Sequence, residues 1–337
     1  MPKISVELGT NTYDIVIARG LRHTIADKLK KMTKATKIAI ITDTKVVRLH
    51  GAELEEQLIR RGFQVVTIAI EAGEASKNLS TLAGVYDRLA KKGLTRQDLI
   101  ITLGGGVVGD LGGFAAATFL RGIDFVQVPT TLLAQIDSSV GGKVAVNLPT
   151  GKNLVGNFYQ PKAVFIDPDY LDTLPKQFLH EGMAEVIKTA AIGDSKLFAA
   201  LESYTNDQEL LAHVEQVIAS CCRFKAKVVA ADEHDTGKRM MLNFGHTIGH
   251  AIEQSYGYGK YNHGKAVGVG MVRITKRSEE LQLTEAGTTE RLSQLLKRYR
   301  LPTKINLGVR EIMQVVTRDK KKRGDKLIIV VLHKIGK

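Results

Sequence analysis

The sequence has little cysteine and no long apolar run. Its 337 residues contain two cysteines, Cys221 and Cys222. Adjacent side chains on a helix point about 100° apart, which suits neither a disulfide nor a zinc knuckle. No segment approaches the roughly 18 apolar residues of a membrane span. The first residues alternate like a strand and lack the apolar core of a signal peptide. We therefore expect a cytoplasmic protein without membrane contact.

Low-complexity tracts and internal repeats are also missing, which excludes global disorder and a fibrous class. Hydrophobic residues make up 44% of the chain and charged residues 25%, as in an ordinary globular protein. The length exceeds the roughly 250 residues at which a single core usually stops growing. We therefore expect two domains.

Positive charge is in excess, with 48 Lys plus Arg against 35 Asp plus Glu and a net charge of +13. Such a surplus suits nucleic acid, an acidic membrane surface or small anionic substrates. The basic residues are scattered rather than gathered into one arm, and no basic–aromatic module accompanies them. We therefore expect no nucleic-acid partner.

The first half of the chain alternates short β-branched runs with helical stretches, which predicts a doubly wound, mainly parallel sheet. A hairpin near residues 3–17 is expected to add an edge. From about Lys176 helical periodicity dominates. We place an α/β domain at 1–174 and a mainly α-helical domain at 175–337. The predicted strands are 37–42, 64–70, 98–103, 125–128, 163–166 and 327–332, and the predicted helices of the second domain are 181–191, 195–203, 209–231, 242–254, 266–281 and 288–299.

A glycine-rich loop follows the predicted strand 98–103 and has the letters G-x-G-x-x-G at Gly104, Gly106 and Gly109. Glycines let backbone amides approach a pyrophosphate at a helix N-terminus; the alternative is a tight strand-to-helix turn. The acidic residue that should end the next strand is missing, because that strand runs into Pro129. Better candidates for a ribose contact follow the two earlier strands: Asp43, Glu74 and Lys77.

A small, polar, glycine-rich run at 135–143 is poor core material and suits the binding of a polar anion. It carries Asp137 and Lys143 and is followed by Asn147, Lys152 and Asn153. The alternative is a surface loop with incidental lysines.

Histidines and carboxylates in the second half suggest zinc. His246 and His250 lie at i and i+4, hence on one helix face, and His263 follows closely. Spacing alone makes His246 and His250 a ligand pair, with His263 or Glu185 as the third ligand. No Glu follows His246 directly, so a metalloprotease is not indicated.

Four segments occur together and in order: 104–110, 135–143, 182–188 and 242–250. In this combination the chain resembles the 3-dehydroquinate synthase family from about residue 37 to Lys320. The resemblance implies an NAD-binding α/β domain and a helical metal domain with the active site between them. It also implies a homodimer.

The resemblance assigns zinc, or alternatively cobalt, to Glu185, His246 and His263, and gives His250 to the substrate phosphate, which overrules the pair expected from spacing. NAD would contact Asp43, Glu74, Lys77, Gly105, Gly106, Val107, Val108, Gly109, Asp110, Thr130, Thr131, Lys143, Lys152 and Thr173. The substrate would meet Asp137, Lys143, Asn153, Lys188, Lys225, Arg239, Asn243, His250 and Lys320, with Arg121 supplied by a second subunit.

The implied substrate is a heptulosonate phosphate, whose carboxylate and phosphate suit Lys and Arg partners. The implied reaction is a transient oxidation by NAD, loss of phosphate, re-reduction and aldol closure to 3-dehydroquinate, a net lyase reaction. Lys265 and Gln177-Phe178 depart from the family pattern. The alternatives are another sugar-phosphate cyclase, making an inosose or a valiolone, and a metal-dependent polyol dehydrogenase.

Overall fold

The computed structural model describes residues 3–256, 261–308, 311–312, 315 and 328–337. The chain divides into two compact units. The first unit contains 1–174 together with 225–234, and the second contains 175–224 and 235–337. The chain therefore first passes from one unit to the other after Leu174. The short segment 225–234, which we expected in the second domain, groups with the first unit.

The first unit is built on a seven-stranded sheet in the order β1-β2-β9-β6-β5-β3-β4. β1 pairs antiparallel with β2, and all other neighbours in this sheet are parallel. The predicted doubly wound, mainly parallel fold is therefore confirmed, as is the N-terminal edge hairpin. The strands are β1 (Lys3–Val6), β2 (Tyr13–Ile17), β3 (Lys37–Asp43), β4 (Gln64–Ile70), β5 (Leu99–Gly104), β6 (Asp124–Pro129) and β9 (Ala163–Ile166).

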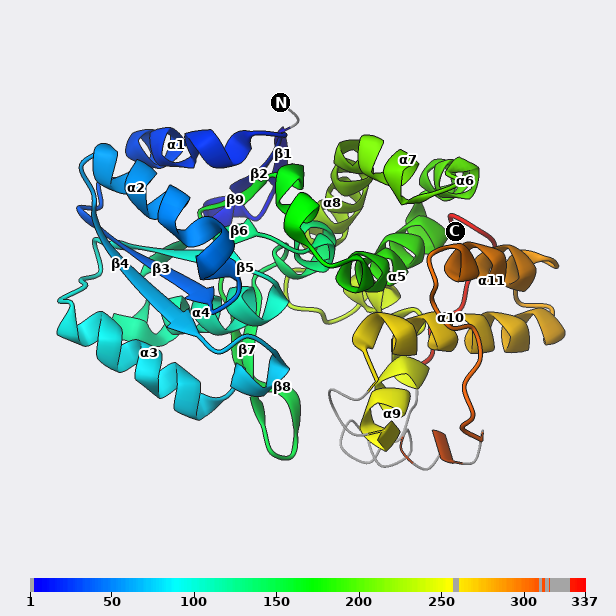
Figure 1. Ribbon diagram of the computed structural model, residues 1–337. Coiled ribbons are helices and arrows are strands. Elements are labelled where there is room, and N and C mark those ends of the chain that lie inside the picture. Colours follow the sequence, from blue (N-terminus) through cyan, green and yellow to red (C-terminus); the bar gives the residue numbers. More distant parts are fainter. Residues whose placement is uncertain (1–2, 257–260, 309–310, 313–314, 316–327) are drawn as a thin grey trace. The chain divides into compact units, whose positions relative to one another are not determined.

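Helices cover both faces of this sheet (Figure 1). Alternate residues of β3 point to opposite faces, so Ile38 and Ile40 enter one core and Ala39 and Ile41 enter the other. The strands read as continuous apolar runs because both faces are buried. The first core is closed by helices α1 (Ile25–Met32) and α2 (Ala52–Arg60), and the second by α3 (Leu79–Lys91) and α4 (Gly106–Thr118).

The strand order changes direction at β3, which lies between β4 and β5. In an open parallel sheet, ligands bind outside the carboxyl ends of the strands at such a switch point. The residues at these ends are Asp43, which closes β3, and Gly104, which closes β5 and leads into α4. The glycine loop therefore lies at the position where the fold itself favours a ligand.

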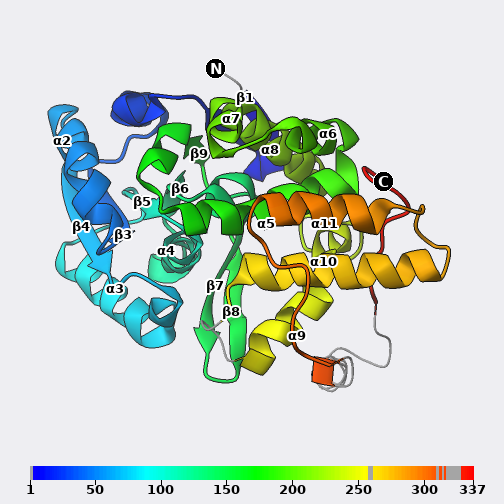
Figure 2. The same ribbon diagram turned by 45° about the vertical axis from the view of Figure 1, so that its right-hand side comes forward.

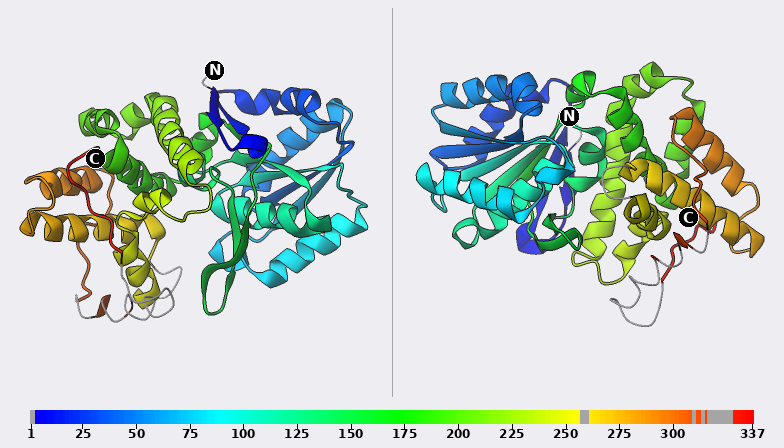
Figure 3. Two further views of the ribbon diagram at one scale, coloured as in Figure 1. Left: turned by 180° about the vertical axis from the view of Figure 1, so that it is seen from behind. Right: turned by 60° about the horizontal axis from the view of Figure 1, so that its bottom comes forward.

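An antiparallel hairpin of β7 (Lys143–Leu148) and β8 (Gly151–Phe158) forms a separate two-stranded sheet, visible as the long green hairpin in Figure 3. The sequence did not predict these strands. Their register shifts between Val146 and Leu148, so that Asn147 lies at a β-bulge.

The second unit is helical in its described part. Helix α10 packs against α9, α5 and α11, and the pairing of α10 with α11 and α9 can be followed in Figure 2. The helices are α5 (Lys176–Gly193), α6 (Ser195–Ser203), α7 (Asp207–Ala212), α8 (Val214–Ala231), α9 (His246–Tyr256), α10 (His263–Glu280) and α11 (Thr288–Arg298), with a short 3₁₀ helix η8 at Lys238–Asn243. The residues of α8 from Lys225 onward group with the first unit. No helix in the described ranges is long and apolar enough to cross a bilayer.

Three predicted elements differ from the structure. The helix predicted at 209–231 is two helices, α7 and α8, that meet at His213. The helix predicted at 242–254 begins only at His246, because η8 ends at Asn243 and Gly245, with a left-handed φ of 78°, redirects the chain. Residues 328–332 of the predicted C-terminal strand are irregular, and Ile328, Ile329 and Val331 are exposed, so this apolar run is not a buried strand. Leu327 lies outside the described residues.

Glycines let α5, α9 and α10 approach one another closely. A Cβ atom at Gly270 of α10 would clash with the carbonyl oxygen of Gly245, and one at Gly264 would clash with that of Glu181 in α5. A Cβ at Gly249 of α9 would lie 3.1 Å from the Cα of Val267. Backbone therefore packs directly on backbone at these three positions, and larger side chains do not fit.

We expect Gly270→Ala to destabilise the protein by about 1–3 kcal/mol, because the added methyl group is forced against rigid backbone. Gly84→Ala is the matched control. Gly84 lies in α3 with nothing near its Cβ position, so alanine should stabilise the protein by about 0.5–1 kcal/mol through helix propensity. Urea unfolding followed by circular dichroism measures both changes. Shifts of the same sign and size in the two variants would contradict this account of the packing.

Candidate functional site

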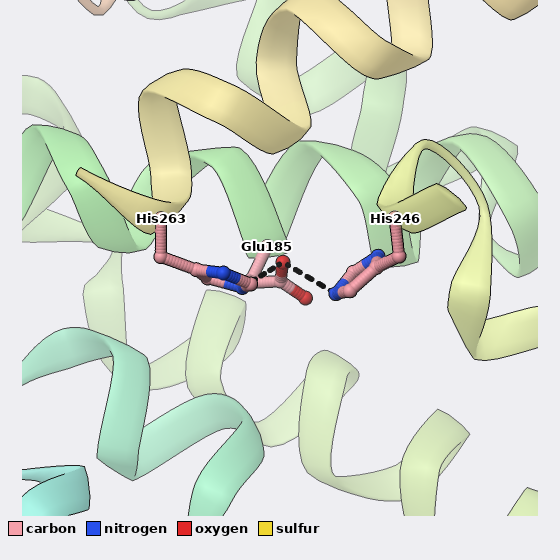
Figure 4. A group of neighbouring side chains, drawn as sticks. All are labelled: Glu185, His246 and His263. Atoms are coloured by element: carbon pink, nitrogen blue, oxygen red, sulfur yellow. Dashed lines mark ion pairs between the residues drawn. The ribbon is translucent and has the colours of Figure 1, made fainter. Parts of the chain in front are cut away.

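Glu185 of α5, His246 of α9 and His263 of α10 meet in the second unit (Figure 4). The Nε2 atoms of His246 and His263 lie 3.5 and 3.4 Å from the Oε1 atom of Glu185. Figure 4 shows the carboxylate between the two imidazoles. Each side chain comes from a different helix, so the group forms only when the three helices pack.

Glu185 is a buried carboxylate, with 1% of its surface exposed. Among the described residues, neither of its side-chain oxygens accepts a well-formed hydrogen bond. Burial alone would raise its pKa, but nearby Lys188, His246 and His263 outweigh burial and hold the pKa well below its usual range. Glu185 is therefore an anion whose Oε2 is paired with Lys188 and whose Oε1 faces the two imidazoles.

His246 is held in one tautomer. Its Nδ1–H donates to the carbonyl oxygen of Phe244 at 3.1 Å, which leaves Nε2 as the atom with a lone pair. Removal from water lowers the pKa of His246 to about 3, against the attraction of Glu185. The ring is therefore neutral at physiological pH, as a metal ligand must be.

His263 is held in the same way by a carboxylate. Its Nδ1 lies 3.3 Å from the Oε2 atom of Glu253, and its Nε2 faces Glu185. Burial lowers its pKa, but the two carboxylates more than compensate and raise the pKa to about 10. Glu253 is buried, with 2% exposed. We did not predict this residue, although an acid within Ala251-Ile252-Glu253, about two helical turns after His246, was a readable signal.

The chemistry of this donor set fits a catalytic divalent metal. Two imidazole nitrogens and one carboxylate form the three-ligand pattern of catalytic zinc, which leaves a position for substrate. His246 is already neutral, whereas His263, whose pKa is raised by two carboxylates, would release its proton when a metal binds. A second possible group, made of His250, Glu253 and His263, shares the His263 ring. His250 itself lies on the exposed side of α9, with its ring centroid 5.4 Å from that of His246. Only in the first group does one buried carboxylate oxygen, the Oε1 of Glu185, face the Nε2 atoms of two histidines among the described residues, and this is not the pair expected from helical spacing.

Three further predicted residues lie in the second unit. Lys188 is one helical turn beyond Glu185, is buried and forms an ion pair with it. Arg239 and Asn243 lie on η8, directly before His246, and Arg239 is 2% exposed. Lys320 lies outside the described residues.

The glycine loop of the first unit is a crowded turn at the N-terminus of α4. A Cβ at Gly105 would lie 3.0 Å from Thr131, one at Gly106 would lie 3.1 Å from the Oγ of Ser138, and one at Gly109 would lie 2.7 Å from Gln127. Side chains are thereby excluded from the amides of the first helical turn, where an anion is favoured. The predicted contacts Val107, Val108 and Asp110 lie in the same turns of α4, and Thr130 follows β6.

A buried ion pair between Lys77 and Asp110 joins the loop after β4 to helix α4. Burial raises the pKa of the Asp110 carboxyl, and the Lys77 ammonium opposes this effect. Glu74 lies on the same loop. The third candidate, Asp43, already caps its own turn, because its Oδ1 accepts from the amides of Lys45 and Val46 at 2.8 and 3.0 Å.

Asp137 and Lys225 contact each other within the first unit, although they are far apart in sequence. The Nζ of Lys225 donates to both the Oδ1 and the carbonyl oxygen of Asp137 at 2.6 Å. The remaining predicted residues of this unit are Lys143, Lys152 and Asn153 on the β7–β8 hairpin, Arg121 at a left-handed φ of 67°, and Thr173, whose Oγ1 lies 2.9 Å from the Nε2 of His50.

Family models match most of the chain. The description "3-dehydroquinate synthase N-terminal" applies to residues 67–181, and "3-dehydroquinate synthase C-terminal" to residues 182–322. A similar curated protein is the 3-dehydroquinate synthase of Clostridium acetobutylicum. It is 54% identical over 337 residues, which cover 100% of this chain and 95% of the relative.

Solved structures with the same fold include two other cyclases. A 2-deoxy-scyllo-inosose synthase, crystallised with carbaglucose-6-phosphate, NAD+ and Co2+, matches with a TM-score of 0.89 and 27% identity, covering 100% of this chain and 93% of its own. A 2-epi-5-epi-valiolone synthase from Streptomyces hygroscopicus subsp. jinggangensis, with NAD+ and Zn2+ bound, matches with a TM-score of 0.88 and 24% identity, covering 98% and 91%.

We expect His246→Ala to abolish stoichiometric metal binding, because His246 is one of the three ligands. His250→Ala should retain about one metal ion per chain, because the fourth position is left for substrate and His250 does not fill it. Metal content is measured by atomic absorption after loading with Zn²⁺ and dialysis. His213→Ala, at an exposed histidine between α7 and α8, controls for loss of a histidine as such. Equal loss of metal in His246→Ala and His250→Ala would favour the pair expected from spacing.

Proposed function

Because this chain belongs to the 3-dehydroquinate synthase family, we propose that it converts 3-deoxy-D-arabino-heptulosonate 7-phosphate into 3-dehydroquinate and phosphate. It is an enzyme of the lyase class, and the reaction belongs to the shikimate pathway of aromatic amino-acid biosynthesis. The observation that carries the proposal is the cluster of Glu185, His246 and His263. The same chain has the glycine loop at the switch point of its sheet.

Bound NAD would accept and return a hydride, and a bound divalent metal would polarise the oxygens of the reacting carbons. The residues of this chain supply the remaining functions. Glu185, His246 and His263 would hold the metal, with Phe244 and Glu253 fixing the two rings. The amides at the start of α4 would bind the pyrophosphate of NAD, and Glu74 and Lys77 would contact the same cofactor.

The substrate carries two anionic groups, and we assign them to basic residues. Lys188 and Arg239 are buried cations, which cost less to keep charged beside an anion. His250, exposed on α9, would bind the phosphate and exchange a proton with it. Asp137 orients the Lys225 ammonium through two hydrogen bonds. We further propose a cytoplasmic homodimer in which Arg121 of each subunit serves its partner.

The rival cyclases use the same kinds of cofactor and differ in their substrate. An inosose or valiolone synthase acts on a sugar phosphate without a carboxylate, so it has less use for the cations at Lys143 and Arg239. A polyol dehydrogenase differs in outcome, because it releases NADH, whereas the cyclase regenerates NAD within each turnover.

We expect the zinc-loaded enzyme to release phosphate from the heptulosonate phosphate without net absorbance at the NADH band. It should not release phosphate from glucose 6-phosphate or sedoheptulose 7-phosphate. Turnover should stop on chelation and return when Zn²⁺ or Co²⁺ is added. Malachite green measures phosphate, and absorbance measures NADH. Phosphate release from one of the other sugars alone would establish a different cyclase, and accumulation of NADH would establish a dehydrogenase.

We expect His250→Ala to lower kcat about 10²–10⁴-fold while metal content stays normal, because a positioned proton donor contributes roughly that factor. Phosphate release by the zinc-loaded variant measures the change, and His213→Ala should keep wild-type kcat. Full activity of His250→Ala would remove this residue from the chemistry.

A further inference from the structure

The side chain of Asn147, in β7, joins the loop after β4, which carries a proposed cofactor contact, to Asn153 of β8, a proposed substrate contact. Its Nδ2–H donates to the Oε1 of Glu74 at 2.7 Å, and its Oδ1 accepts from the amide of Asn153 at 2.8 Å. Its backbone N–H donates to the carbonyl oxygen of Lys77 at 2.8 Å. Asn147 is thus hydrogen-bonded to Glu74 and Lys77 after β4 and also to Asn153 of β8.

The β-bulge explains why Asn147 can make these bonds. The pairing of β7 with β8 shifts between Val146 and Leu148, which takes Asn147 out of the hairpin ladder. A bulge re-aims a side chain and releases its backbone groups. Asn147 instead forms an isolated bridge with Asn78, on the loop that follows Lys77. Asn147 therefore attaches the hairpin to this loop.

The two contacts require a side chain that donates at one atom and accepts at the other. An amide provides both functions. Aspartate at this position would keep the acceptor for Asn153 but would place a carboxylate against that of Glu74. Asn153 also has a left-handed φ of 55°, an uncommon conformation that needs support from its surroundings.

We propose that Asn147 is a positioning residue that couples cofactor binding to substrate binding. It fixes the Glu74 carboxylate toward NAD and, through the same amide group, fixes the backbone of Asn153 toward the substrate. This inference rests on the proposed function, which gives Glu74 to NAD and Asn153 to the substrate. Because binding free energies are coupled reciprocally, NAD should tighten substrate binding by the same factor as substrate tightens NAD binding.

The first measurement is a calorimetric titration of NAD into the zinc-loaded protein. We expect Asn147→Asp to raise the Kd of NAD about tenfold, since it replaces a hydrogen bond with two facing carboxylates. Asn157→Asp is the matched control, because it adds the same charge to an exposed position of the same hairpin. Its Kd for NAD should equal that of wild type, and both variants should keep the wild-type circular dichroism spectrum.

Glu74→Gln provides the rescue. In the double variant Asn147→Asp/Glu74→Gln, the glutamine amide can donate to the aspartate, so the link is restored with reversed polarity. The double variant should bind NAD at least fivefold more tightly than the product of the two single effects predicts. Multiplicative single effects would overturn the proposal, because Asn147 would then act without Glu74.

The coupling to substrate is tested with the phosphonate analogue of the heptulosonate phosphate, which keeps both anionic groups but cannot lose phosphate. In wild type, NAD should lower the Kd of this analogue, and in Asn147→Asp that enhancement should disappear. An unchanged enhancement in Asn147→Asp would overturn the coupling. Wild-type turnover of the heptulosonate phosphate, measured in parallel, tests the proposed function separately. Failure of turnover with an intact Asn147–Glu74 cycle would reject the substrate but keep the positioning role.

Discussion

The second unit depends on one buried negative charge. A carboxylate removed from water is expensive unless cations or hydrogen-bond donors compensate it. Glu185 has almost no contact with water, and its compensation comes from Lys188 on its own helix and from two histidines on α9 and α10. These helices approach through glycines that allow backbone contact. Packing and electrostatics therefore support each other here, and a change in either disturbs the metal-ligand geometry.

Most of the sheet could be predicted because its signal is local. Strands buried on both faces are continuous apolar runs, and β3 and β4 have the predicted starts. The β7–β8 hairpin was missed, because its glycines and polar residues resemble a loop and its pairing depends on contacts with α4 and with the loop after Lys77. The break at His213 was missed for a similar reason, since the apolar period continues across it.

The candidate site, like the sheet, could be predicted only in part. The glycine loop and the histidine cluster could be found by letters and spacing, because tight turns and metal ligands restrict residue type strongly. Helical spacing favoured His246 with His250, yet the structure brings Glu185 and His263 to His246 from other helices. Spacing along one helix does not show which residues other helices bring to the same site. The contact of Glu253 with His263 and the hydrogen bonds of Asn147 could not be predicted for this reason, since their partners come from other elements.

The discontinuity of the first unit bears on how the chain folds during synthesis. Domains usually fold as units in the order in which they leave the ribosome. Residues 225–234 belong to the first unit, although residues 175–224 of the second unit are encoded before them. Lys225, which holds Asp137, is therefore translated about sixty residues after β9, the last strand of the sheet, which ends at Ile166. The α/β sheet can form early, but its polar anion site must wait for sequence that comes from within the other unit.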